Sequence, residues 1–299
     1  MVDQNQDVFS SEPGHTNLVQ HHIITEPGKK VKLRPYRIPE ARREAVRTEV
    51  KTMLEAGVIE ESNSEWCSPI VLVPKPGGTI RFCNDFRKLN EISKFDAYPM
   101  PRIDELIERL GTARYISTLD LTKGYWQVPL APEAREKTAF ATPDGLFHYR
   151  KLPFGLHGAP PTFQRLMDRV LRPHRGYAAA YIDDIVIHGS EWDTHVKQVS
   201  AVLQALREAG LTANPKKCQL GLQEAEYLGY TIGRGCVKSQ MKKVEAIQDW
   251  PRPLTKKQVC TFVGLTSYYR RFIPQTETHV SDRNTCVSVF IFINSRRQI

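Results

Sequence analysis

The sequence predicts an α+β fold in which an antiparallel sheet is backed by helices. Strand-like and helix-like stretches alternate along the chain, but without the regular strand–helix repeat of a parallel sheet. Two helical stretches, 160–171 and 191–209, flank an apolar, β-branched run at 180–187, and we expect them to form the layer behind the sheet. That run carries two adjacent carboxylates, Asp183 and Asp184, which we expect at the tip of a hairpin and which make it the first candidate for a functional site.

The N-terminal part of the chain divides into three predicted segments. Residues 1–38 are polar and turn-rich, which predicts a leader or linker. Apolar residues at helical spacing then predict a helix at 40–56, placed between a proline and a glycine. A hairpin follows, formed by strands at 69–73 and 79–83 around a turn rich in proline and glycine.

The remaining elements follow from the same two periodicities. Further helices are predicted at 101–110, 160–171, 191–209, 242–249 and 256–272, the last beginning with the capping box Thr255-Lys-Lys-Gln258. Further strands are predicted at 115–120, 137–142, 146–151, 218–221 and 225–232. Residues 152–158 are expected to form a loop, and residues 275–299 lose the helical pattern.

Composition limits the class of protein. The 42 Lys and Arg exceed the 33 Asp and Glu and leave a net charge of +9, which favours a polyanionic partner, nucleic acid before membrane. The chain contains no apolar run long enough to span a bilayer, and its polar N-terminus argues against a secretory signal. Its six scattered cysteines include no Cys-x-x-Cys pair, so we expect reduced thiols in an intracellular protein and no zinc site.

Three aspartates stand next to apolar runs. Asp183 and Asp184 interrupt the run 180–187, and Asp120 ends the run 115–119. An isolated Asp-Asp pair would most simply be an exposed turn. A third carboxylate at the end of another predicted strand favours one metal site built across a sheet, because unpaired buried carboxylates need a compensating cation.

Oxygen ligands without nearby His or Cys favour Mg²⁺, with Mn²⁺ as the alternative. Two such ions about 3.5–4 Å apart would stabilise the attacking and leaving oxygens of an in-line phosphoryl displacement. Successive strand residues face opposite sides, so Asp120 and Asp183 are predicted as the primary ligands and Asp184 as a weaker, partly outer one.

Several basic and backbone groups near these aspartates could hold phosphates. They are the Lys123-Gly124 backbone just after Asp120, Arg81 on the hairpin, and Lys75 at the hairpin tip. Together these features predict metal-dependent phosphoryl transfer on a basic protein. They leave open whether the protein is a polymerase or a nuclease.

Seven stretches in order resemble the reverse transcriptases of gypsy-class LTR retrotransposons and, more distantly, of retroviruses, over residues 7–274. They are RFCNDFRKLN (81–90), STLDLTKGYWQVPL (117–130), KTAFATPDG (137–145), LPFGLHGAPPTFQRLMD (152–168), YIDD (181–184), YLGY (227–230) and LTSYYRRFIP (265–274). The resemblance implies a right-hand polymerase: fingers at 39–95 and 128–158 beginning within 1–38, palm at 96–127 and 159–234, a truncated thumb at 235–274, and an unmatched tail at 275–299.

The resemblance also implies roles for residues at matching positions. Asp120, Asp183 and Asp184 match the catalytic metal triad, with the Leu121 carbonyl as a minor ligand. The implied nucleotide-binding residues are Lys75, Arg81, Lys123, Gly124, Tyr125 and Phe154, with Tyr125 as the steric gate beneath the sugar. Read without the resemblance, a Tyr at 125 would be core packing. The implied primer grip is Tyr227, Leu228, Gly229 and Tyr230.

The function implied is an RNA-directed DNA polymerase that extends a primer on RNA or DNA with dNTPs and two Mg²⁺ ions, without a membrane partner and with no prediction of oligomeric state. Its expected place is intracellular, in a cytoplasmic retroelement particle, with the nucleus as the alternative. A catalytically weak or silent nucleic-acid-binding remnant is the second hypothesis and a metal-dependent nuclease the third. Glu65, Cys67 and Pro161 depart from the family pattern, and the match ends at Pro274, so we expect a fragment of a polyprotein or a degraded copy.

Overall fold

The computed structural model describes residues 5–74, 80–111, 113–234, 236–239, 247, 250–251 and 253–267. Its centre is a four-stranded antiparallel sheet with the strand order β7-β8-β4-β9, which confirms the predicted α+β class. These strands are β7 (Ala178–Tyr181), β8 (Asp184–Gly189), β4 (Tyr115–Asp120) and β9 (Gln219–Leu222).

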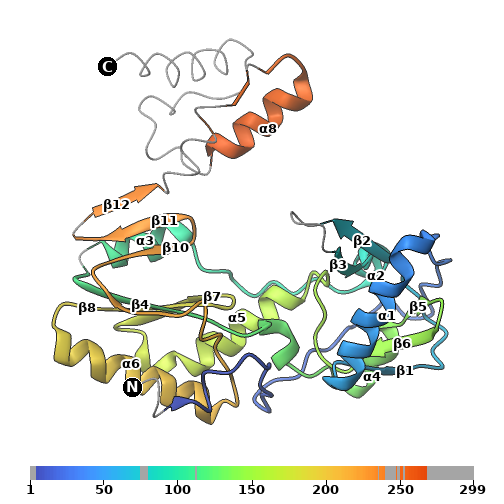
Figure 1. Cartoon of the computed structure of the whole chain (residues 1–299), viewed down its shortest axis with the longest axis horizontal. Helices are drawn as coiled ribbons and strands as arrows, with labels where there is room; N and C mark the ends of the chain where they lie inside the picture. Colours follow the sequence, from blue (N-terminus) through green and yellow to red (C-terminus); the bar gives the residue numbers. More distant parts are fainter. Residues whose placement is uncertain are drawn as a thin grey trace.

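Two helices cover one face of the central sheet (Figure 1), as predicted. They are α5 (Ala159–Val170) and α6 (Trp192–Glu208), and each buries one apolar stripe. The stripes include Phe163, Leu166 and Met167 on α5 and Val199, Val202 and Leu203 on α6. Full burial of a side chain of this size stabilises the fold by about 1.5–3 kcal/mol, so these two helices anchor the sheet firmly.

The opposite face of the central sheet is covered as well. The elements there are α3 (Ile103–Leu110) and a three-stranded sheet of β10 (Glu224–Tyr227), β11 (Tyr230–Gly233) and β12 (Cys236–Ser239). Val186 packs into the core on this side, whereas its neighbours Ile185 and Ile187 pack into the core on the helical side. A sheet buried on both faces explains why β4 and β8 read as continuous apolar runs.

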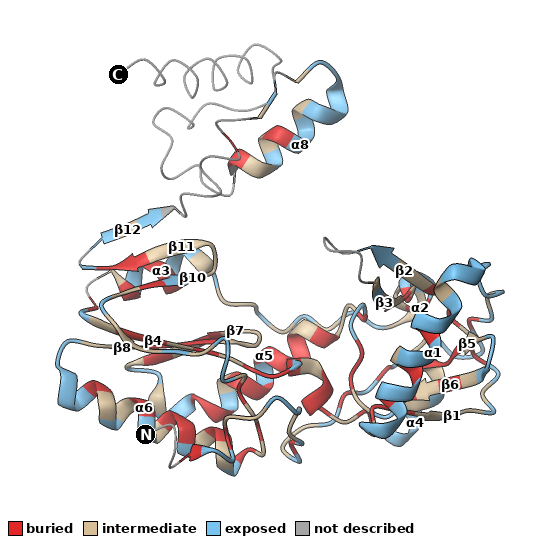
Figure 2. Ribbon diagram, viewed as in Figure 1, coloured by how far each residue is buried: buried red, intermediate tan, exposed pale blue. Residues whose placement is uncertain are grey.

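A second lobe is built around a three-stranded sheet of the order β1-β6-β5 and the hairpin β2-β3 (Figure 2). Its elements are α1 (Glu40–Glu55), β1 (Ile59–Glu61), β2 (Ile70–Pro74), β3 (Ile80–Asn84), α2 (Arg87–Ile92), α4 (Pro132–Arg135), β5 (Phe140–Thr142) and β6 (Gly145–Tyr149). Short 3₁₀ turns lie at Gly124–Gln127, Glu136–Thr138 and Arg172–His174. One continuous hydrophobic core joins this lobe to the helical side of the central sheet.

The N-terminal segment corrects a prediction. Residues 5–38 are not a free leader or linker, because Val8 and Ile23 are buried in the main core. Single β-bridges join Phe9 to Ala213 near the central sheet, and His21 to Leu130 and Lys32 to Cys67 toward the second lobe. Contacts made one residue at a time leave no periodic pattern, so the sequence reads as irregular although the segment is packed.

Other elements agree with the sequence to within a few residues. The capping box is confirmed, because the Thr255 N–H donates to Gln258 Oε1 at 3.1 Å and the Gln258 N–H donates to Thr255 Oγ1 at 3.3 Å at the start of α8 (Lys256–Ser267). The single strand predicted at 225–232 is wrong: it is the hairpin β10–β11, which turns at Leu228 and Gly229 with positive φ. β1, α2, α4 and β12 were not predicted.

Some predictions fall on residues that the structure does not describe. Lys75, most of the helix expected at 242–249 and the whole of 275–299 lie outside the described residues. Within the described part of the chain, no helix has the length and apolar character needed to cross a bilayer.

We predict that Gly210→Ala destabilises the fold by at least about 2 kcal/mol. Gly210 follows α6 at φ +69°, and an added Cβ would lie 2.2 Å from the His15 carbonyl oxygen of the packed N-terminal segment. The measurement is urea denaturation. Gly176→Ala is the control, because no heavy atom lies within 4 Å of the new Cβ. Equal stability of the two variants would contradict the packed role of the segment.

Candidate active site

The three predicted aspartates lie at one end of the β4–β8 ladder. β7 and β8 are joined by the two-residue turn Ile182–Asp183, closed by the pair Tyr181 and Asp184. The register of β4 against β8 sets Asp120 directly opposite Asp184. Directly opposite residues of an antiparallel pair share a face, so these two side chains are neighbours. The Leu121 N–H donates to the Asp183 carbonyl oxygen at 3.1 Å and fixes the turn beside the end of β4.

The two adjacent aspartates do not lie on one continuous strand. Asp183 is a turn residue, so the strict alternation of strand side chains does not apply to it. Asp184 is the one that stands opposite Asp120. The sequence-based ranking, with Asp184 as the weaker ligand, therefore loses its geometric basis and stays an untested prediction.

The turn itself has unusual backbone geometry. Ile182 has φ +58°, in the left-handed region where β-branched residues are rare. At the first central position of a two-residue hairpin turn, positive φ is ordinarily supplied by Gly. A strained residue of this kind costs on the order of 1–3 kcal/mol and persists only where surrounding contacts enforce it.

The three carboxylates influence one another electrostatically. Burial, and then the charges of Asp183 and Asp120, raise the pKa of Asp184 to about 6. Burial and the Asp120 charge also raise the pKa of Asp183 above its ordinary value. Like charges held close together disfavour ionisation, and a cation at the site would relieve this cost.

One cation of the chain itself meets this cluster. Lys217 Nζ lies 3.1 Å from both carboxylate oxygens of Asp120. The turn that carries Lys217 is fixed to the end of β4, because the Asn214 N–H donates to the Asp120 carbonyl oxygen at 2.8 Å. Lys217 is 62% exposed, so its ammonium can leave the carboxylate at little cost. Sequence reasoning missed this residue, because a lysine in a polar turn gives no periodic signal.

The donor set suits a hard divalent cation. Across the residues that the structure describes, no three His, Cys, Asp or Glu side chains form a preassembled metal-binding group. Both oxygens of Asp120 are bound to Lys217, and charged carboxylates repel one another. Carboxylate and main-chain carbonyl oxygens are nevertheless the ligands that Mg²⁺ prefers, so Asp120, Asp183 and Asp184 fit it once Lys217 is displaced.

The turn after β4 places two further predicted residues beside the aspartates. A Cβ at Gly124 would lie 2.9 Å from Asp183 Cβ, so glycine permits this close approach. The Tyr125 ring packs 5.0 Å from the Phe154 ring and 5.6 Å from the Phe163 ring, between centroids. Burial, followed by the Asp183 charge, raises the pKa of the Tyr125 hydroxyl well above its usual value, so Tyr125 is neutral near the carboxylates. Lys123 Nζ lies 4.5 Å from the Trp126 ring centroid.

The other predicted residues lie on neighbouring elements. Arg81 is exposed on β3, and Phe154 is 57% exposed. Tyr227 and Tyr230 close the β10–β11 hairpin, and the Tyr227 hydroxyl donates to the Asp184 carbonyl oxygen at 3.1 Å. The predicted primer-grip hairpin is therefore bonded directly to the strand that carries Asp184. Figure 1 shows the β2–β3 and β10–β11 hairpins on opposite sides of the molecule.

Comparisons with known proteins agree with the resemblance. Residues 73–232 match the family described as reverse transcriptase (RNA-dependent DNA polymerase). Among similar Drosophila melanogaster proteins, the Pol polyprotein from transposon 297 is 36% identical over 91% of this chain, and that from gypsy is 41% identical over 76%. The Schizosaccharomyces pombe transposon Tf2-3 polyprotein is 31% identical over 85% of this chain. The chain spans 26% or less of the length of these relatives.

Solved structures agree on the fold. A foamy viral protease–reverse transcriptase in complex with double-stranded DNA superposes with a TM-score of 0.85 at 23% identity, covering 99% of this chain and 66% of that one. The same protein with an RNA/DNA hybrid gives a TM-score of 0.83 at 22% identity, covering 99% and 43%. The predicted right-hand polymerase fold is confirmed.

We predict that Asp184→Asn stabilises the metal-free protein at pH 7.5 by about 1–2 kcal/mol, allowing for partial solvent exposure. The pKa of Asp184 is about 6 in the folded protein and about 3.9 in the unfolded chain. The protonated carboxyl group therefore contributes its full stability below a pH of about 4, and this contribution is lost as the pH rises through 6. The advantage of Asn should therefore shrink as pH falls from about 7 to about 4.

The measurement is thermal unfolding in EDTA across this pH range, with Asp193→Asn as the control at an exposed aspartate. An advantage that stays constant with pH would contradict the raised pKa of Asp184.

Proposed function

We propose that this chain, which belongs to the reverse transcriptase family, is an RNA-directed DNA polymerase module of a retroelement Pol polyprotein. One observation carries the proposal. Asp120 and Asp184, with Asp183 in the adjoining turn, meet at the end of one antiparallel ladder inside the matched region. In the reaction, the 3′-hydroxyl of a primer attacks the α-phosphate of a dNTP, and pyrophosphate leaves.

Each part of the site has an assigned role. The three carboxylates, with the Leu121 carbonyl, would hold two Mg²⁺ ions, or Mn²⁺ in their place. When bound, these ions supply Lewis-acid stabilisation of the attacking and leaving oxygens. Lys217 neutralises Asp120 until a metal takes its place. Arg81, Lys75 and the Lys123-Gly124 backbone would face the triphosphate, and Phe154 would border the nucleotide pocket beside Tyr125.

The partners proposed are an RNA or DNA template with its primer, and dNTPs. The net charge of +9 supports a polyanionic partner, and the foamy viral relatives were solved with double-stranded DNA or an RNA/DNA hybrid. We assign fingers to 39–95 and 128–158, palm to 96–127 and 159–234, and the start of a thumb to 235–274. Tyr227 to Tyr230 would contact the primer end, and the expected setting is an intracellular retroelement particle.

Asp120→Asn should lower primer extension on an RNA template by at least about 100-fold, because it removes one ligand charge with almost no change in volume. The measurement is oligo(dT) extension on poly(rA) with Mg²⁺, together with a circular dichroism spectrum to show that the fold is kept. Asp193→Asn on the exposed first turn of α6 is the matched control.

Two outcomes would contradict the proposal. Extension by Asp120→Asn at the wild-type rate would remove the aspartates from catalysis. A wild-type chain that binds primer–template without adding nucleotides would favour the nucleic-acid-binding remnant instead.

Tyr125→Ala should raise the ratio of rNTP to dNTP incorporation by at least about tenfold. The ring is held between Phe154 and Phe163, and in the proposed pose it lies beneath the sugar, where it leaves no room for a 2′-hydroxyl. The ratio is measured with both nucleotides on one template. Tyr125→Phe keeps the ring and should keep the discrimination. An unchanged ratio in Tyr125→Ala would leave Tyr125 as core packing.

A further inference from the structure

We infer that Gln164 is a positioning residue of the active site: its buried amide holds the Ile182–Asp183 turn in its left-handed conformation and so sets the direction of Asp183. This inference rests on the proposed function, because it concerns the same carboxylates. Gln164 is fully buried on α5, one helix layer behind the turn.

The side-chain amide of Gln164 forms two hydrogen bonds on the β7 side of the turn. Its Oε1 accepts a hydrogen bond from the Ile182 N–H at 2.8 Å. Its Nε2 donates to the Ala180 carbonyl oxygen at 3.1 Å. Ile182, the residue with the unfavourable φ, is therefore held through its own backbone N–H. At the tip of the hairpin, Gln164 Oε1 takes the place of a backbone carbonyl as the acceptor for this N–H.

The Asp168 carboxylate determines which end of the Gln164 amide carries the oxygen and which the nitrogen. Gln164 Nε2 also donates to Asp168 Oδ1 at 3.0 Å, and the Tyr98 hydroxyl donates to Asp168 Oδ2 at 2.6 Å. A carboxylate only accepts hydrogen bonds, so it selects the NH₂ end of the amide. The oxygen of Gln164 must then face Ile182, where an N–H requires an acceptor.

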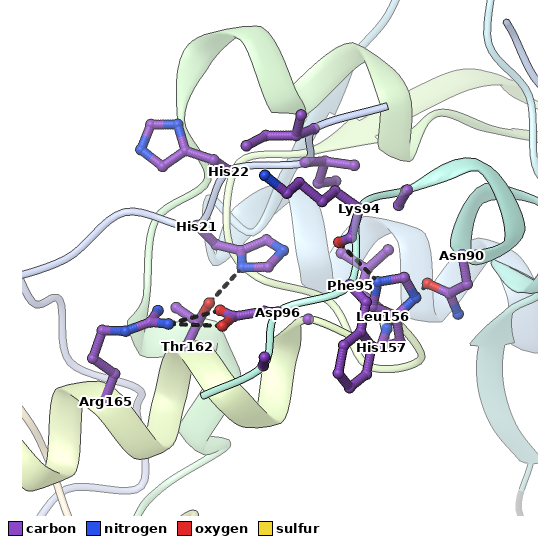
Figure 3. A pocket seen from close by; sticks show the side chains of 15 residues that line it. His21, His22, Asn90, Lys94, Phe95, Asp96, Leu156, His157, Thr162 and Arg165 are labelled. Atoms are coloured by element: carbon purple, nitrogen blue, oxygen red, sulfur yellow. Dashed lines mark hydrogen bonds and ion pairs between the residues drawn. The ribbon is translucent and has the colours of Figure 1, made fainter. Parts of the chain in front are cut away.

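The network continues to the surface. The Arg165 guanidinium lies 4.6 Å from the Tyr98 ring centroid and donates to both carboxylate oxygens of Asp96 at 2.8 Å. Figure 3 shows this ion pair at the edge of a pocket of about 300 Å³ that His21 and Phe95 also line. Arg165 therefore packs against the Tyr98 ring, the Tyr98 hydroxyl holds Asp168, and Asp168 in turn holds the Gln164 amide.

The two hydrogen bonds from Gln164 to Ala180 and Ile182, here called the Gln164 clamp, determine the position of Asp183. Asp183 follows Ile182, so a change of φ at Ile182 rotates the peptide that carries the Asp183 side chain. Its carbonyl is tied to the Leu121 N–H, and its Cβ lies against Gly124, so little room exists for an alternative placement. Loss of the clamp should allow Ile182 to return to negative φ and move the carboxylate away from Asp120.

The test compares Gln164→Met, which keeps length and burial but removes both hydrogen-bonding ends, with Val202→Ala, which creates a buried cavity on α6, a different helix from the one that carries Gln164. Gln164→Met should bind Mn²⁺ about tenfold more weakly, measured by electron paramagnetic resonance titration. Its kcat for extension should fall about 10- to 100-fold with a nearly unchanged dNTP KM. Without metal, amide hydrogen exchange at 178–187 should accelerate.

The decisive variant is Ile182→Gly, because glycine adopts the left-handed conformation without strain. In that background, Gln164→Met should weaken Mn²⁺ binding by less than about threefold, the signature of coupled residues. Equal Mn²⁺ affinity in Gln164→Met and wild type, or an equal loss in both backgrounds, would overturn the inference. Mn²⁺ binding and exchange are read whether or not the chain extends a primer, so absence of extension would count only against the proposed function.

Discussion

The site depends on holding like charges together at the end of a buried ladder. Asp120, Asp183 and Asp184 are brought together by the β4–β8 register and a two-residue turn, and burial, followed by the charges of Asp183 and Asp120, raises the pKa of Asp184. Repelling groups stay together only where backbone geometry leaves no alternative. The two-sided burial of β4 and β8 supplies that rigidity, since slippage by one residue would move Val186 into the core on the helical side and Ile185 and Ile187 into the opposite core.

A shared hydrophobic core also connects the two lobes rigidly. One hydrophobic core runs from α1 and the β1-β6-β5 sheet to α5 and α6, and the N-terminal segment contributes Val8 and Ile23 to it. Arg207 on α6 bonds Asp7, and the Thr122 hydroxyl, just after β4, donates to the Ser10 carbonyl oxygen at 2.7 Å. A continuous core keeps the second lobe, which carries Arg81, in a fixed relation to the carboxylates on the central sheet.

The sequence allowed prediction wherever one residue pattern had one physical cause. The helical stripe of α5, the apolar run of β4 and the capping box at Thr255 each reflect local periodicity or chemistry, and each is confirmed. Long-range pairings could not be predicted in this way. The packing of 5–38, the Lys217–Asp120 ion pair and the Gln164 clamp depend on distant segments meeting, and a single Gln or Lys gives no sign of its partner. The family resemblance identified the aspartates' roles, but it did not identify these supports.

At position 182, backbone strain and side-chain burial make opposing contributions to the stability of the turn. Glycine would remove the strain at Ile182, which is on the order of 1–3 kcal/mol. Ile182, however, packs against the main core, and partial burial of its side chain recovers on the order of 1–2 kcal/mol that glycine would lose. Isoleucine therefore keeps the packing against the core, and the hydrogen bonds of Gln164 hold the strained turn in the conformation on which the carboxylates depend.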